Sequence, residues 1–174
     1  MKARIQILTT REAWAACSVV RASIAECCFP DHHGDPQVMH TWLANKTPEN
    51  FEAWFAAPQA IPLGAFDGDK LVGVALVSGS SLSLCYVTVE ALRRRIGRSL
   101  LHAAENLTRG RGIEELHLES TRTAEAFYLR HGFQPSGPVK LRAGMQALPM
   151  SKHLGKALGT PILARPGSAI CKLC

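Results

Sequence analysis

The chain has 174 residues, of which 47% are hydrophobic and 20% are charged, and its formal net charge is +6. A chain of this length and apolar content buries a sizeable core, which excludes global disorder and two full domains. Apolar runs such as 71–77 are far shorter than the roughly 20 residues that span a bilayer, so an integral membrane protein is excluded as well. We expect one domain over residues 1–154. An extension follows at 155–174, where glycine and proline become frequent and hydrophobic periodicity is lost.

The cysteines predict reduced thiols and a cytoplasmic protein. There are six of them at irregular spacing, and Cys27 and Cys28 are adjacent, unlike the pattern of a secreted disulfide framework. The terminal pair Cys171 and Cys174 lacks the two further ligands that a zinc site needs. A signal peptide is not expected, because charged residues at positions 11 and 12 interrupt the first apolar stretch.

The first half of the chain predicts a strand, a long helix and two short helices. Residues 4–8 alternate as in a strand, and Thr9 with Glu12 forms a capping box that starts a helix reaching about residue 26. Two further helices are expected within 35–57, because each has a capping side chain followed by proline. These two starts are Asp35-Pro36 and Thr47-Pro48.

The middle of the chain predicts an antiparallel meander. Strands 61–66 and 71–77 flank the turn 67–69, as in a hairpin, and a third strand is expected over 82–89. The elements expected after it are helix 96–108, strand 115–119, helix 123–130, and strands 139–141 and 146–151. The fold class is therefore mixed α/β, with a largely antiparallel sheet flanked by helices on both faces.

An arginine-rich turn joins the third strand of the meander to the next helix. Its arginines are Arg93, Arg94, Arg95 and Arg98. Backbone N–H groups of such a turn and the positive end of the helix dipole make an anion site, and Gly97 lets a backbone approach closely. A phosphate is the anion that this arrangement favours, although a solvated arginine-rich turn has the same composition.

A second element lies downstream, Ala124-Glu-Ala-Phe-Tyr-Leu-Arg-His-Gly-Phe133. Together, the turn and this element resemble the GNAT superfamily of acetyl-coenzyme A-dependent N-acyltransferases, in which a strand, a glycine-containing phosphate turn and a helix precede an A-x-x-F-Y-x-x-x-G-F helix. The stretch 148–154 is similar to the last strand of that family. The resemblance covers residues 4 to 154 and implies the GNAT fold, with acetyl-coenzyme A as co-substrate.

The turn fits the family pattern in two registers. Aligning 96–101 with G-I-G-x-A-L-L places Arg95 at the first glycine, whereas the pattern Arg94-x-x-Gly97-x-Ser99 recovers the family arginine but moves the helix start by two residues. The first register is preferred because it keeps the strand in phase from Val87.

The resemblance implies a coenzyme site and a general acid. Tyr128 matches the family tyrosine that protonates the leaving thiolate, and backbone N–H groups near Tyr86 and Val87 would hold the thioester carbonyl and the pantetheine. Thr121 stands where many relatives carry asparagine. The residues expected to contact the coenzyme are Tyr86, Val87, Val89, Leu92, Arg93, Arg94, Arg95, Ile96, Gly97, Arg98, Ser99, Thr121, Ala124 and Phe127.

The general base does not follow from the resemblance. An alkylamine with a pKa near 10.4 must lose a proton before it attacks, at a cost of roughly 4 to 5 kcal/mol at pH 7. Some family members use a glutamate on the strand before the phosphate turn, but the matching position here is Ser81. The remaining candidates are Glu119 and the pair Asp31 and His32. The loop 31–35 also reads as a metal site or as a polar loop with a helix cap, and no metal is expected.

The sequence thus predicts an N-acetyltransferase, an acyltransferase that moves the acetyl group of acetyl-coenzyme A to a primary amine by direct attack. A small-molecule amine is the expected acceptor, a protein amine stays open, and so does a homodimer; neither nucleic acid nor membrane is an expected partner. Two alternatives remain. One is a non-catalytic acyl-coenzyme A sensor, motivated by Ser81 and Arg95. The other is a polyanion-binding module built on the arginine cluster.

Overall fold

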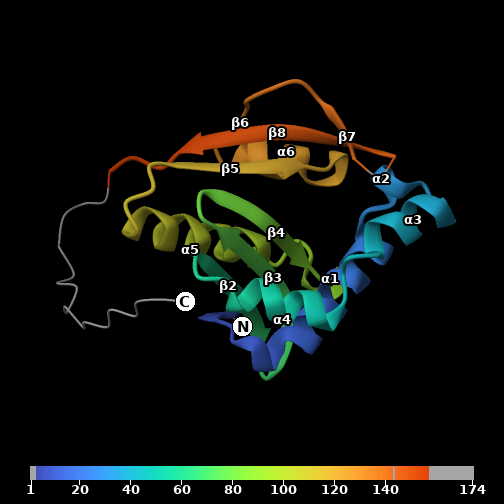
Figure 1. The fold of residues 1–174 in the computed structure, drawn as a ribbon, viewed down its shortest axis with the longest axis horizontal. Helices are drawn as coiled ribbons and strands as arrows, with labels where there is room; N and C mark the ends of the chain where they lie inside the picture. The colour runs from blue at the N-terminus through green and yellow to red at the C-terminus, as the bar shows by residue number, and fades with distance from the viewer. Residues whose placement is uncertain (1–2, 143, 157–174) are drawn as a thin grey trace, which may run out of the picture.

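A computed structural model describes residues 3–142 and 144–156. Its eight-stranded sheet has the order β1-β2-β3-β4-β5-β8-β6, with β7 paired to β8 (Figure 1). The strands are β1 (Arg4–Ile7), β2 (Ala60–Asp67), β3 (Lys70–Ser78), β4 (Ser81–Val87), β5 (Glu115–Ser120), β6 (Gln134–Pro135), β7 (Lys140–Arg142) and β8 (Met145–His153). The α-helices are α1 (Ala13–Cys27), α2 (Phe29–His32), α3 (Pro36–Leu43), α4 (Pro48–Ala56), α5 (Ile96–Gly110) and α6 (Arg122–Arg130); η1 (Thr10–Glu12) and η2 (Val89–Ala91) are short 3-10 helices. The mixed, mostly antiparallel sheet with helices confirms the predicted fold class.

The predicted helix starts are confirmed by their hydrogen bonds. The Thr9 backbone N–H donates to the Glu12 carboxylate at 2.7 Å, which completes the capping box before α1. The carboxylate of Asp35 accepts the Gln37 N–H at 2.7 Å, and the hydroxyl of Thr47 accepts the Asn50 N–H at 3.3 Å. Local sequence therefore fixes where these helices begin, because each cap satisfies N–H groups that the helix itself leaves unpaired.

Three details differ from the predicted elements. The strand expected over 82–89 ends at Val87, and Val89 lies in η2, where the chain turns away from the sheet. Helix α2 and strand β6 were not predicted, because neither is long enough to show a hydrophobic period. The predicted extension lies outside the described residues from position 157 onward, and Cys171 and Cys174 lie outside them too.

The sheet parts between β4 and β5. These parallel neighbours pair only at Ser81 and His117, where the His117 N–H donates to the Ser80 carbonyl at 2.8 Å. In Figure 1, β5 and β8 lie at the top of the view, apart from β2, β3 and β4. Side chains alternate along β4, so Leu84 and Tyr86 pack toward α1, whereas Cys85 and Val87 pack toward α5 and α6. The gap between β4 and β5 therefore adjoins both faces of the sheet, the one covered by α1 and the one covered by α5 and α6.

Two apolar clusters fix the helices to the two faces of the sheet. Leu100 and Leu101 of α5 are fully buried on one face, and Val20 and Ile24 of α1 on the other. Within the residues described, no helix is long and apolar enough to cross a membrane.

Candidate active site

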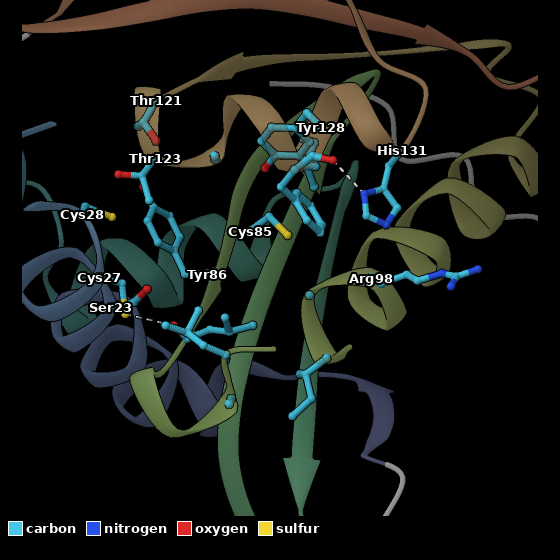
Figure 2. A pocket seen from close by; sticks show the side chains of 18 of the residues that line it. Ser23, Cys27, Cys28, Cys85, Tyr86, Arg98, Thr121, Thr123, Tyr128 and His131 are labelled. Atoms are coloured by element: carbon cyan, nitrogen blue, oxygen red, sulfur yellow. Dashed lines mark hydrogen bonds between the residues drawn. The ribbon is translucent and has the colours of Figure 1, made fainter. Parts of the chain in front are cut away.

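A cavity of about 460 Å³ lies where β4 and β5 part. In Figure 2 its labelled side chains divide into two sets, with Tyr128 and Cys85 between them. Arg98 and His131 lie on one side, and Ser23, Cys27, Cys28 and Tyr86 on the other. The predicted site residues that line the cavity are Tyr86, Val87, Leu92, Arg93, Arg95, Ile96, Gly97, Arg98, Glu119, Thr121, Ala124, Phe127 and Tyr128. Val89, Arg94, Ser99, Asp31 and His32 were also predicted but are not among the lining residues.

The turn into α5 presents backbone donors to the cavity. Arg95 precedes the helix with a φ of 63°, and the first intrahelical bond runs from the Ser99 N–H to the Arg95 carbonyl. The N–H groups of residues 96–98 come before that bond, and these are the groups a helix leaves for an outside acceptor. Arg95 thus adopts the left-handed conformation that favours glycine, which supports the register that puts it at the family's first glycine.

Arginine side chains surround this turn unevenly. Arg93, Arg95 and Arg98 line the cavity, joined by Arg130 from α6. Arg94 instead pairs with the carboxylate of Asp67 at 2.8 Å, and this guanidinium lowers the pKa of Asp67. The prediction that Arg94 contacts a coenzyme therefore has no support from its position.

Tyr128 is buried in the middle of the cavity wall. Its ring packs edge-on against Phe127 and Phe133, with centroids 5.2 and 5.5 Å apart. Burial raises the pKa of Tyr128 well above its ordinary value, and the nearby Cys85 raises it further. The hydroxyl therefore stays protonated at neutral pH, and the same shift makes it a weaker acid than an ordinary tyrosine.

The backbone of β4 presents a donor to the gap. The Thr88 N–H donates to the Val72 carbonyl on β3 at 3.0 Å. Because successive strand N–H groups point to opposite edges, the Val87 N–H and carbonyl face away from β3 and toward the gap. The Cys27 thiol lies 3.9 Å from the Val87 carbonyl, which agrees with that direction. By the same alternation the Tyr86 N–H faces β3, so Val87 is the better placed of the two predicted donors.

Glu119 is a candidate base that lines the cavity but is already paired. Its carboxylate lies 2.9 Å from Lys140 and 3.3 Å from Arg142. The hydrogen bond from Lys140 lowers the pKa of Glu119, with a smaller contribution from Arg142. A lowered pKa makes a weaker base, so the structure does not favour Glu119 as the group that deprotonates an amine.

Asp31 and His32 serve the fold. The buried Asp31 carboxylate accepts hydrogen bonds from the Arg122 N–H at 2.7 Å and the Thr123 N–H at 3.2 Å, and so caps α6. The Nδ1 atom of the buried His32 accepts the Gly34 N–H at 3.0 Å. The loop that holds them does not form a ligand set, since nowhere in residues 3–142 and 144–156 do three or more His, Cys, Asp or Glu side chains gather as metal ligands would.

Several lining residues were missed by the sequence analysis. They are Ser23, Cys27, Cys28, Leu82, Ser83, Cys85, Ala91, Thr123, Arg130 and His131. His131 lies one turn beyond Phe127, and its Nδ1 atom is 2.7 Å from the Phe127 carbonyl. The helical spacing from Tyr128 to His131 could have revealed this residue. The α1 residues carried no signal, because only the tertiary structure brings that helix to β4.

Comparisons with known proteins agree with this geometry. A family model for the acetyltransferase (GNAT) domain matches residues 30–154. Among solved structures, a GCN5-related N-acetyltransferase from Rhodopseudomonas palustris has a TM-score of 0.78 at 20% identity, covering 88% of this chain and 96% of that chain. No curated protein matches the chain in sequence.

Two further structures hold coenzyme A. The PaiA N-acetyltransferase from Thermoplasma acidophilum has a TM-score of 0.73 at 22% identity, covering 88% of this chain and 99% of that chain. An aminoglycoside 6′-N-acetyltransferase has a TM-score of 0.65 at 16% identity, covering 90% of this chain and 99% of that chain. At these identities the structures show a shared fold. The family model spans most of the chain, which therefore belongs to the GNAT family of acetyltransferases, a family that acetyl-coenzyme A fits as co-substrate.

Proposed function

We propose that this protein transfers the acetyl group of acetyl-coenzyme A to an amine, with the coenzyme lying in the gap between β4 and β5. The observation that carries the proposal is that one cavity contains both the arginine-rich helix start and the buried hydroxyl of Tyr128. The arginine-rich helix start would bind the phosphates of the coenzyme, and the Tyr128 hydroxyl would protonate the leaving thiolate.

The residues present fit the two ends of the coenzyme. Phosphate oxygens would accept the N–H groups of residues 96–98 and the guanidinium groups of Arg93, Arg95 and Arg98. Pantetheine would pass along the β4 edge beside Val87 and Phe127. Phe127 lies beside Gly97, and its ring atoms would be in ordinary van der Waals contact, at 3.7 Å, with an added Cβ.

The proposed reaction is a direct transfer. The lone pair of a neutral amine attacks the thioester carbonyl, whose oxygen accepts the Val87 N–H as negative charge develops. The C–N bond forms and the C–S bond breaks, the thiolate takes the proton of the Tyr128 hydroxyl, and the amine loses its surplus proton to water. Solvent then reprotonates Tyr128.

The test combines binding and turnover. Acetyl-coenzyme A at 100 times its Kd adds about 2.7 kcal/mol to the free energy of unfolding and should raise the Tm by roughly 5 to 10 °C. Double-stranded DNA serves as the polyanion control, and free thiol release with amine acceptors measures turnover. A Tm shift without turnover would favour the sensor alternative. A salt-sensitive shift with DNA alone would favour the polyanion-binding module.

A further inference from the structure

His131 ends helix α6 at the edge of the cavity. It is partly buried and lines the cavity together with Arg98 and Arg130. Its ring packs on that of Phe127, with centroids 4.4 Å apart. The proposed reaction does not involve this side chain, although it lies among the groups assigned to the coenzyme phosphates.

One hydrogen bond decides which ring nitrogen of His131 carries a hydrogen. The Nδ1 atom lies 2.7 Å from the Phe127 carbonyl, and a carbonyl oxygen can only accept. The backbone N–H of His131 does not compete for that oxygen, because it donates to the Tyr128 carbonyl at 3.0 Å. Nδ1 therefore donates to Phe127, and in the neutral ring Nε2 has a lone pair and no hydrogen.

Nε2 is the ring atom that His131 offers to a ligand. Figure 2 shows it on the side of the ring that faces Arg98. A neutral Nε2 would put its lone pair against a phosphate oxygen, and two acceptors do not form a hydrogen bond. A protonated Nε2 would instead donate a charge-assisted hydrogen bond to the phosphate. A phosphate at this place therefore favours the imidazolium.

The charges near His131 act in both directions. The last carbonyl groups of α6 favour a cation at this end of the helix. The guanidiniums of Arg98 and Arg130 oppose a further cation in the same cavity. The remaining charged or titratable groups on the surrounding elements are Asp31 on α2, Arg93 and Arg95 before α5, His102 and Glu105 on α5, Glu119 on β5, and Lys152 on β8.

The three carboxylates of this set already have partners. Glu105 is bound by Lys152 at 2.7 Å, Glu119 is bound from β7, and Asp31 caps the opposite end of α6. Burial raises the pKa of Cys85 to about 12 and that of Tyr128 well above its ordinary value, so neither group titrates near neutral pH. The anion that would stabilise an imidazolium here must therefore come with the ligand.

We infer that His131 is a coenzyme-binding residue whose Nε2 takes up a proton when the coenzyme phosphates bind. The juxtaposition that carries this is a histidine whose Nδ1 is held by a helix carbonyl and whose Nε2 lies among guanidiniums. The proton comes from the buffer and forms the Nε2–H bond, and the thioester takes no part. The inference rests on the proposed function only in that the coenzyme occupies this cavity, and it requires no acceptor.

Proton uptake can be measured directly. Calorimetric titration with acetyl-coenzyme A at pH 7, in HEPES and in Tris, gives the number of protons taken up from the difference between the two enthalpies. We expect about half a proton or more per coenzyme, since an imidazole ordinarily changes its charge between pH 5 and 8. By linkage, half a proton over two pH units raises the coenzyme Kd about tenfold from pH 6 to pH 8.

The coenzyme carries two phosphate groups that Nε2 could meet. Its 3′-phosphate has a pKa of about 6 and would release a proton on binding to arginine, which is the opposite sign. Dephospho-coenzyme A has the pyrophosphate alone. Uptake with both ligands would place Nε2 at the pyrophosphate, and uptake with acetyl-coenzyme A alone would place it at the 3′-phosphate. Net release with both ligands would overturn the inference.

Two variants of His131 separate charge from hydrogen bonding. His131→Gln is neutral at every pH, so it should abolish the uptake and make the Kd at pH 6 as weak as at pH 8. His131→Lys is charged throughout, so it should also abolish the uptake but keep tight binding at pH 8. The Tm of each variant reports whether it is folded.

His102→Gln is the matched control. His102 is an exposed histidine of α5, and its Nε2 atom lies 3.5 Å from the Nε atom of Arg98, but it does not line the cavity. This variant should take up the same number of protons as the unmodified protein. Loss of the uptake in His102→Gln, or its persistence in His131→Gln, would assign the proton to another group and overturn the inference.

A role of His131 as base for the amine gives a different result. His131→Gln would then lower kcat while the Kd kept its dependence on pH, which would also overturn the inference. Failure of the proposed function can be told apart from these outcomes. Coenzyme binding with proton uptake but no turnover would overturn acetyl transfer alone, whereas no coenzyme binding at any pH would overturn both.

Discussion

The carboxylate of Asp31 accepts a hydrogen bond from the backbone N–H of Arg122 at 2.7 Å, across 91 positions of sequence. Helix α6 makes no cap of its own, because the Thr121 side chain does not bond its first turn. Helix α2 therefore caps the helix that carries Tyr128.

Removal of this cap should affect both stability and catalysis. We expect Asp31→Ala to lower the free energy of unfolding by about 1 to 2 kcal/mol and to lower kcat, because α6 loses its anchor. Urea titration and acetyl-transfer kinetics provide the measurements. Asp31→Asn keeps an acceptor oxygen and should recover part of both losses.

Asp35→Ala is the matched control, since it removes the cap of α3, which accepts the Gln37 N–H at the same distance of 2.7 Å. It should cost similar stability while leaving kcat unchanged. If the Asp31 and Asp35 variants lost kcat equally, the effect of Asp31 on catalysis would not come from its capping of α6.

If Tyr128 is the general acid, loss of its hydroxyl should lower the rate of acetyl transfer without lowering the affinity for the coenzyme. Tyr128→Phe should lower kcat by a factor on the order of 100 and leave the coenzyme Kd within about twofold, because only the hydroxyl is lost. Tyr86→Phe removes the other tyrosine hydroxyl of the cavity and should reduce kcat much less. An unchanged kcat in Tyr128→Phe would remove this residue from the proton-transfer step.

Two adjacent arginines should differ in their effect on coenzyme affinity. Arg93 lines the cavity, whereas Arg94 is paired with Asp67. Loss of one charge-assisted contact is worth about 1.5 kcal/mol, so Arg93→Ala should raise the coenzyme Kd roughly tenfold in calorimetry at low salt. Arg94→Ala should leave the Kd nearly unchanged and, because only an exposed ion pair is lost, should change stability little. Equal effects on Kd would place the phosphates elsewhere.

The turn before α5 contains a strained position. Arg95 has a φ of 63°, a conformation that costs a residue with a Cβ about 1 kcal/mol or more. Arg95→Gly should therefore keep or raise the free energy of unfolding by up to about 1 kcal/mol, although it removes a guanidinium from the cavity. Chemical denaturation checks the stability, and a clear loss would show that the arginine side chain contributes more than the backbone strain costs.

Because the thiol of Cys28 is buried, we expect its contribution to stability to be lost in alkaline solution. Its folded pKa is about 12, above the ordinary value of 9.0, mainly because burial disfavours the thiolate. The unfolded chain therefore releases this proton first. The contribution of Cys28 to stability is full below about pH 9 and is lost as pH rises toward 12. Urea titrations over this range should show a shallower decline for Cys28→Ala than for the unmodified protein.

Much of the fold could be predicted because its signals are local. Capping residues such as Thr9 and Asp35 bond within three positions along the chain, so the sequence shows the helix starts directly. The short α2 and β6 could not be predicted in this way, since a few residues display no period. Trp14 is 67% exposed, and this depends on which face of α1 the sheet covers, which local sequence does not decide.

The sequence by itself indicated the family, and it predicted the arginine-rich turn and Tyr128 as parts of a coenzyme site, because these signals lie in contiguous residues. Only the tertiary structure decided which side chains meet. It turned Arg94 toward Asp67, assigned Asp31 to the start of α6 and brought Cys27 and Cys28 to β4. The physical reason is that hydrogen bonds and ion pairs between distant segments depend on how helices pack against the sheet.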